Sequence, residues 1–130
     1  MPSSVARPAA APSKLALEYY QALLEFETDC WDVNHAVSNG RRDFVLLDVR
    51  ALSLYQAGHL PQAENLPHHK ISEKSLAAYS SDTLFVVYCA GPHCNGADKA
   101  AVRLAKLGRP VKKMIGGVIG WLDEGFELRT

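Results

Sequence analysis

Short apolar runs mark the chain at residues 44–47, 84–88 and 111–115; the first two are continuous, and the third is interrupted by Lys112 and Lys113. Runs of this kind are typical of strands that are buried on both faces. Between the last two runs, residues 97–107 place alanine and leucine on one helical face, and the pattern ends at Gly108. Shorter helices are predicted at residues 32–37, 52–57, 73–78 and 118–124. Strand, helix and strand at this spacing predict an α/β fold class, with a parallel sheet and helices on both of its faces.

The segment before the first run divides into two parts. Residues 1–13 are rich in proline, alanine and serine, which predicts a disordered N-terminus. Residues 14–27 have apolar side chains at helical spacing, which predicts a helical extension with Ser13 as its N-cap. The apolar positions are Ala16, Tyr20, Leu23 and Leu24. We expect this helix to pack on the domain formed by residues 28–130, with a partner protein as the alternative.

Composition and charge disfavour several classes of function. With 14 basic and 14 acidic residues, the chain has no net charge to attract nucleic acid or an anionic membrane. No stretch approaches the ~20 apolar residues needed to span a bilayer, and the first residues lack the apolar run of a signal peptide. The three cysteines are an odd count, which is a poor disulfide framework. We therefore expect a reduced, cytoplasmic setting, in which a cysteine is reactive or simply buried.

Cys89 directly follows the apolar run at 84–88, and a loop rich in small residues, 90–96, leads from it into the next helix. Ligands of open parallel sheets bind beyond the carboxyl ends of the strands. Backbone N–H groups of the loop and the first helical turn converge there with the helix dipole, which lowers the pKa of a thiol. The alternative is a buried strand-end cysteine without chemistry. Because a structural cysteine needs no such loop around it, the pattern favours a reactive Cys89.

Two sets of motifs resemble the rhodanese domain family, in the family's order. The first set is residues 44–50 (FVLLDVR) and 57–67 (AGHLPQAENLP). The second set is residues 86–89 (VVYC), 106–108 (KLG) and 115–117 (IGG), followed by Gly120 and Trp121. The motifs cover roughly residues 28–127. Each motif is weak alone, but the combination is highly specific.

The resemblance implies a five-stranded parallel sheet flanked by helices, in which the catalytic cysteine closes the fourth strand at the position of Cys89. It also implies a ping-pong transfer with one covalent intermediate. The cysteine takes the outer sulfur of a donor such as thiosulfate, becomes a persulfide, and passes that sulfur to cyanide or another thiophile. Asp48, Arg50 and His59 match motif positions that we interpret as structural, with Arg50 paired to an acidic neighbour. Trp121 is interpreted as core or pocket wall.

The loop after Cys89 departs from the family's common form in two ways. It is longer and has neither arginine nor lysine. Related phosphatases of this fold grip phosphate with an arginine in an enlarged loop, so phosphatase or arsenate-reducing activity is disfavoured. The loop also contains a second thiol, Cys94, which either resolves or protects a Cys89 persulfide, or merely lines the loop. His93 could donate to substrate or stabilise a thiolate as a cation, although loop histidines are usually solvated.

We therefore expect a rhodanese-type sulfurtransferase with Cys89 as its nucleophile. The loop residues assigned to substrate binding are Ala90, Gly91, His93, Cys94, Asn95 and Gly96. No cofactor and no metal are expected, because the cysteine spacing and the lack of a second pair do not suit zinc. The expected partners are a small-molecule sulfur donor and a thiophilic acceptor, with a protein persulfide as an alternative donor, and the chain is a monomer or homodimer. The alternative function is a non-catalytic rhodanese-like binding module or a Cys89/Cys94 redox sensor.

Overall fold

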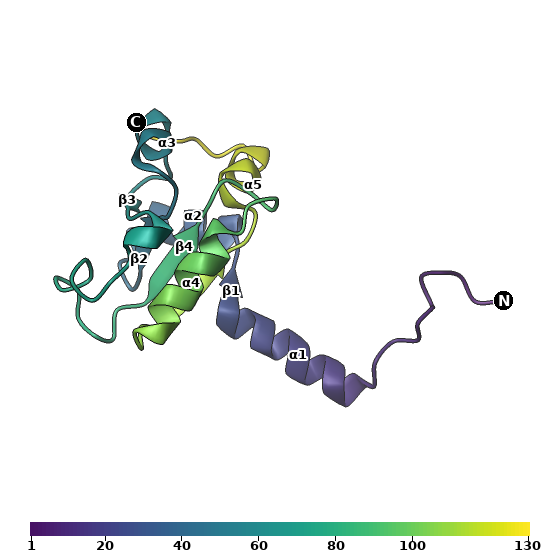
Figure 1. Ribbon diagram of the computed structural model, residues 1–130. Helices are drawn as coiled ribbons and strands as arrows, with labels where there is room; N and C mark the ends of the chain where they lie inside the picture. Colours follow the sequence, from purple (N-terminus) through teal and green to yellow (C-terminus); the bar gives the residue numbers. More distant parts are fainter.

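A five-stranded sheet with the order β1-β5-β4-β2-β3 forms the centre of the molecule (Figure 1). The structure is a computed structural model that describes all residues, 1–130. The strands are β1 Glu27–Thr28, β2 Val45–Asp48, β3 Glu64–Asn65, β4 Phe85–Tyr88 and β5 Val111–Met114. Every neighbouring pair is parallel. The predicted α/β class and the five-stranded parallel sheet implied by the resemblance are confirmed.

Helices cover both faces of the sheet. They are α1 Ser13–Phe26, α2 Cys30–Ser38, α3 Leu52–Ala57, α4 Gly96–Lys106 and α5 Gly117–Asp123, with a short 3₁₀ helix, η1, at His68–Lys70. Successive side chains of a strand point to opposite faces. Phe85 and Val87 of β4 therefore pack in one core cluster with residues of α4, whereas Val86 and Tyr88 pack in a second cluster with residues of α2 and α5.

The central strand, β4, determines where the candidate site lies. All four of its residues are buried, and it pairs with β2 on one side and β5 on the other. Such a strand needs apolar side chains on both faces, which explains the continuous run FVVY. The strand ends at Tyr88, so Cys89 lies at the carboxyl edge in the middle of the sheet.

One predicted helix is absent. Residues 73–78 form consecutive turns rather than a helix. The Ser75 hydroxyl accepts a hydrogen bond from the Ser72 amide at 2.9 Å, and the Ser72 hydroxyl accepts one from the Ser75 amide at 3.1 Å. Serine side chains compete with the helical ladder in this way. The apolar positions of the segment reflect the burial of Leu76 in the core, not a helical face.

The N-terminal helix differs from the prediction at its first residue and in how it packs. Ser13 is its first helical residue, and the N-cap is Pro12, whose extended ψ of 142° starts the helix without a side-chain cap. The helix buries no residue and extends away from the sheet (Figure 1), so the prediction that it packs along the domain is wrong. Lys112 holds only its last turn, through a 2.8 Å hydrogen bond from Nζ to the Leu24 carbonyl.

The boundaries of this extension also follow from the structure. Residues 1–12 contain no helix or strand and are exposed. Glu27, which the sequence assigned to the extension, belongs to β1 and pairs with Lys113 of β5. None of the helices is both long enough and apolar enough to cross a membrane.

Candidate functional site

The loop that follows Cys89 is anchored by the start of α5. The Val118 amide donates to the Cys89 carbonyl at 3.1 Å, and the Ile119 amide donates to the Ala90 carbonyl at 3.0 Å. Gly117 allows this approach, because a Cβ there would lie 2.6 Å from the Cys89 carbonyl oxygen, and its φ is +61°. The start of the loop is therefore fixed by a helix that comes almost thirty residues later in the chain.

A cleft of about 470 Å³ opens between this loop and the end of β5. Of the predicted site residues, Cys89, Gly91 and Cys94 line it. Its other lining residues are Pro92, Ala97, Asp98, Lys113, Met114, Ile115, Gly116 and Gly117. Ala90, His93 and Asn95 instead border a shallower hollow on the outer side of the loop, which also includes Cys94. The structure thus brings two thiols together at the cleft and leaves His93 facing outward.

The two thiols meet at Gly96, the first residue of α4. A Cβ at Gly96 would lie 2.7 Å from Cys89 Sγ and 3.5 Å from Cys94 Sγ. The Cys89 sulfur therefore occupies the space that a Gly96 side chain would need, and the Cys94 sulfur lies beside it. Cys89 is 7% exposed, and Cys94 is more accessible. The close approach of the Cys89 sulfur therefore favours glycine as the first residue of the helix.

The electrostatics of the thiol pair correct the expectation of a low pKa at Cys89. Burial, together with the hydrogen bond to Cys94, raises the pKa of the Cys89 thiol to about 11, although the Ala90 and Gly96 amides act in the opposite direction. The hydrogen bond from Cys89, assisted by the Gly96 amide, lowers the pKa of Cys94. Desolvation of a core side chain outweighs the amides that the sequence argument relied on. The first negative charge of the pair therefore forms on Cys94.

Lys113 is a cleft residue that the sequence analysis missed. Its Nζ lies 3.0 Å from Asp98 Oδ1 and 3.4 Å from Glu27 Oε2, and its side chain is 28% exposed. Lys112 and Lys113 are neighbours on β5, where successive side chains point to opposite faces of the sheet. The position of Lys113 near the carboxyl end of the strand was the available signal. It supplies the cleft with the cation that the loop lacks.

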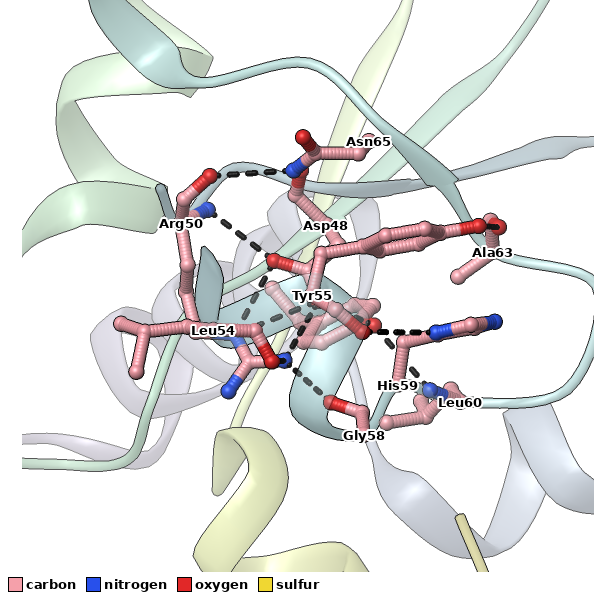
Figure 2. A network of polar contacts seen from close by, with 10 residues as sticks. Asp48, Arg50, Leu54, Tyr55, Gly58, His59, Leu60, Ala63 and Asn65 are labelled. Carbon is pink, nitrogen blue, oxygen red and sulfur yellow. Dashed lines mark hydrogen bonds and ion pairs between the residues drawn. The ribbon is translucent and has the colours of Figure 1, made fainter. Parts of the chain in front are cut away.

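Asp48 and Arg50 form a buried ion pair beneath the site (Figure 2). Arg50 Nη2 donates to Asp48 Oδ2 at 2.7 Å and to the Gly58 carbonyl at 2.7 Å. The Tyr88 hydroxyl donates to the same carboxylate at 2.8 Å. This network connects the ends of β2 and β4 with the turn after α3. The predicted pairing of Arg50 with an acidic neighbour is confirmed.

The remaining motif residues also have structural surroundings. His59 Nδ1 contacts the Tyr55 carbonyl at 2.8 Å, and its ring stacks on Tyr55 with ring centres 3.8 Å apart (Figure 2). Trp121 is fully buried and donates from Nε1 to the Glu127 carbonyl. Cys30 lies in the core cluster of α2 and α5, on the opposite face of the sheet from the cluster that contains Cys89. None of these residues lines the cleft.

Comparisons with known proteins agree with this fold. The family model described as "Rhodanese-like domain" matches residues 32–124. A Bacillus halodurans protein of known structure is 36% identical, with a TM-score of 0.88 over 91% of this chain and 86% of that protein. A thiosulfate sulfurtransferase from Pseudomonas aeruginosa has a TM-score of 0.68 at 24% identity over 80% of this chain and 20% of that protein, which is a likeness of fold.

Another similar protein is named as a transcriptional regulator rather than as a sulfurtransferase. An HTH-type transcriptional regulator of Mycobacterium tuberculosis is 39% identical over 90 residues, which are 64% of this chain. The match covers 39% of that regulator, so this chain spans about two fifths of its length.

Proposed function

The chain belongs to the rhodanese-like domain family, and from this we propose that it is a sulfurtransferase that carries a sulfane sulfur on Cys89. The donor is a compound such as thiosulfate, and the acceptor is a thiophile such as cyanide. The main observation in support is the position of Cys89, at the central carboxyl edge of a parallel sheet and on the wall of a cleft of about 470 Å³. Parallel sheets bind their ligands at this edge.

The first half of the reaction forms the persulfide. The Cys89 sulfur attacks the outer sulfur of thiosulfate, the S–S bond of the donor breaks, and sulfite leaves with the bonding electron pair. The proton of Cys89 passes to Cys94, the thiol of the pair that ionises first because its pKa is lowered, or to water where Cys94 is replaced. The Ala90 and Gly96 amides interact with Cys89 and stabilise the charge that develops on its sulfur. We assign the cradle to the amides of residues 90–96, with the exception of Pro92, which has no N–H.

The second half returns the thiol. The acceptor attacks the outer sulfur of the persulfide, and the electron pair of the broken S–S bond returns to Cys89. With cyanide, the product is thiocyanate. Cys89 thiolate then takes a proton from Cys94 or from water. The reaction needs no cofactor, because the sulfur is transferred as S⁰: each leaving group keeps the electron pair of the broken bond, and each nucleophile supplies the pair for the new bond.

Lys113 is the residue that we assign to the charged end of the donor. Its ammonium group lines the same cleft as Cys89 and is accessible from solvent. Asp98 and Glu27 compete for this ammonium group, since both carboxylates lie within 3.4 Å of it. We therefore expect modest affinity for a dianion such as thiosulfate, and better use of a donor with less negative charge.

Mass spectrometry of the protein after incubation with thiosulfate tests the proposal. We expect one extra sulfur on the peptide that contains Cys89, and loss of that sulfur when cyanide is added. The Cys89→Ser variant must lack the adduct. Cys30→Ser is the matched control, because it removes a buried thiol on the other face of the sheet. Absence of an adduct on Cys89 in both wild type and Cys94→Ser, with thiosulfate and with a low-molecular-weight persulfide, would contradict sulfur transfer.

A redox sensor is the second candidate, and the contact between Cys89 and Cys94 favours it. In this function an external peroxide oxidises Cys94, and Cys89 closes a disulfide. The two functions differ in turnover. A sulfurtransferase converts thiosulfate and cyanide catalytically, whereas a sensor gives no thiocyanate and changes state once for each oxidant molecule.

A further inference from the structure

The site contains a second sulfur nucleophile that simple sulfur transfer does not require. Cys94 lies in the loop five residues after Cys89, and a turn closed by a 3.0 Å hydrogen bond from its amide to the Gly91 carbonyl directs it back to the site. Both thiols line the same cleft. The nucleophile and its neighbour are thus positioned by one loop and one helix start.

The two sulfur atoms share one small volume. Each lies within 3.5 Å of the point where a Gly96 side chain would begin, and no side chain is interposed there. The remaining cysteine, Cys30, is in the other core cluster, behind the sheet. A persulfide on Cys89 therefore has one intramolecular thiol within reach, and that thiol is Cys94.

We propose that Cys94 resolves the Cys89 persulfide by closing a Cys89–Cys94 disulfide and releasing hydrosulfide, so that the domain reduces sulfane sulfur to sulfide. This inference rests on the proposed function, because it begins from the persulfide. The Cys94 thiol gives its proton to the outer sulfur of the persulfide, and the resulting thiolate attacks Cys89 Sγ. A new S–S bond forms between the two cysteines, and the bond from Cys89 to the outer sulfur breaks. The outer sulfur leaves as HS⁻ with the bonding pair. The two cysteine sulfurs are oxidised, and the sulfane sulfur is reduced.

The identity of the leaving group favours this direction. Attack on the outer sulfur would merely move the persulfide to Cys94 and would expel the Cys89 thiolate. Thiol exchange is faster when the leaving sulfur has the lower pKa. Hydrosulfide is the conjugate base of a stronger acid than a thiol buried as Cys89 is, so it leaves more readily. The cleft of about 470 Å³ provides space for the departing sulfur.

The cycle closes with an external reductant. Two low-molecular-weight thiols reduce the Cys89–Cys94 disulfide and become a disulfide themselves. With thiosulfate as donor, the overall reaction converts thiosulfate and two thiols into sulfite, hydrogen sulfide and one external disulfide. Both thiols of the site are regenerated.

The test is a single turnover without oxygen and without added thiol. Pre-reduced protein is mixed with one equivalent of thiosulfate, and free sulfide and the mass of the tryptic peptides are followed with time. For wild type we expect close to one hydrosulfide for each protein molecule that reacts, and a Cys89–Cys94 disulfide. For Cys94→Ser and Cys94→Ala we expect a persistent Cys89 persulfide and at least a tenfold slower release of sulfide. Cys30→Ser must behave as wild type.

The outcomes separate the two proposals. A stable persulfide in wild type, with no disulfide and the same slow release of sulfide as in Cys94→Ser, would overturn the resolving role while leaving sulfur transfer in place. Absence of a persulfide in the Cys94 variants, together with absence of both sulfide and disulfide in wild type, would remove the sulfur-transfer premise itself. Circular dichroism and the melting temperature confirm that both Cys94 variants are folded before they are compared.

Discussion

Two neighbouring sulfur atoms with opposite pKa shifts define the chemistry at the scale of single residues. The thiol at the end of β4 is kept protonated by burial, and the more accessible thiol in the loop is the one that ionises first. Groups that interact this closely titrate as a pair, and the pair as a whole loses its first proton more easily than an isolated thiol. Cys89 is therefore the buried thiol that stays protonated, and Cys94 is the more accessible thiol that ionises first.

Alkylation at different pH values checks this division. We expect iodoacetamide to modify Cys94 at a pH below the ~8.5 of an ordinary thiol, and to modify Cys89 only as the pH approaches its pKa of about 11. In Cys94→Ala the hydrogen bond that raises the pKa of Cys89 is lost, so Cys89 should react at a lower pH than in wild type. Peptide mass spectrometry measures both rates. Modification of Cys89 before Cys94 in wild type would contradict the assignment.

The cation of the cleft gives a prediction about substrate affinity. Lys113→Met should raise the KM for thiosulfate about threefold to tenfold, which corresponds to about 0.7–1.4 kcal/mol, with a smaller effect on kcat. Asp98→Asn should lower the KM, because it frees the ammonium group of Lys113. Lys112→Met is the matched control, since this side chain contacts the Leu24 carbonyl outside the cleft. Steady-state thiocyanate formation measures all three, and an equal effect of both lysine variants would argue against a role for Lys113.

At this scale the sequence located the cysteine of the cleft, which we propose as the nucleophile, but not its protonation state. Cys89 could be found because a buried run ends there and small residues follow. The raised pKa depends on how deeply the strand end is buried, which no local pattern encodes. The sequence analysis missed Lys113 for a related reason, because its place in the cleft beside Cys89 depends on the pairing of β4 with β5.

At the scale of elements, the junction between the loop and α5 is a steric requirement. Gly117→Ala should destabilise the protein by about 1–3 kcal/mol through strain at a positive φ, with a further cost because the new Cβ collides with the Cys89 carbonyl. We expect it to abolish sulfur loading on Cys89. Gly108→Ala separates the two effects, since Gly108 has a φ of +75° but open space around it. That variant should show strain alone and keep sulfur loading. Denaturant unfolding and persulfide mass spectrometry provide the two readouts.

The ion pair that connects β2 with the turn after α3 gives a second prediction for this scale. Arg50→Met leaves the Asp48 carboxylate buried with the Tyr88 hydroxyl as its remaining side-chain partner, and we expect a loss of about 3–5 kcal/mol of unfolding free energy. Arg41→Met breaks an exposed pair with Asp43 and should cost no more than about 1 kcal/mol. Urea unfolding measures both. Similar losses in the two variants would show that burial of the Asp48 pair is energetically unimportant.

Elements were predictable where the core imposes a pattern. Strands β2 and β4 follow continuous apolar runs because their side chains are largely buried on both faces. Strand β5 is marked only by apolar residues on either side of its two lysines. Helix α4 has a clear apolar face because it covers β4. The edge strands β1 and β3 have two residues each and leave no such pattern. The helix predicted at residues 73–78 was wrong, because one buried leucine in a series of turns gives the same sequence pattern as a short helical face.

At the scale of the whole molecule, α1 adds little to the domain. Leu17, Tyr20 and Leu24 are between 59% and 72% exposed, and no residue of the helix is buried. A variant that lacks residues 1–25 should therefore melt within about 2 °C of the full chain, since surface changes away from packed features usually alter stability by less than about 0.5 kcal/mol. It should also form the Cys89 persulfide at the same rate.

A longer deletion provides the comparison for the variant that lacks residues 1–25. Removal of residues 1–31 also removes β1 and Cys30, which pair with β5 and pack in the core. That variant should lose several kcal/mol, as expected for loss of core packing. Calorimetry compares the two deletions. A large loss of stability in the shorter deletion would show that residues 14–26 belong to the folded unit.

The hydrogen bonds from Val118 and Ile119 to the strand end have a consequence for the order of events during synthesis. These amides leave the ribosome after the whole loop has emerged, so a nascent chain displays Cys89 and Cys94 before the two bonds that fix their backbone can form. We therefore expect the proposed chemistry at the strand end to begin only when the last helix has docked. An interrupted translation product that stops upstream of α5 would carry both thiols, and we expect it not to be charged with sulfur.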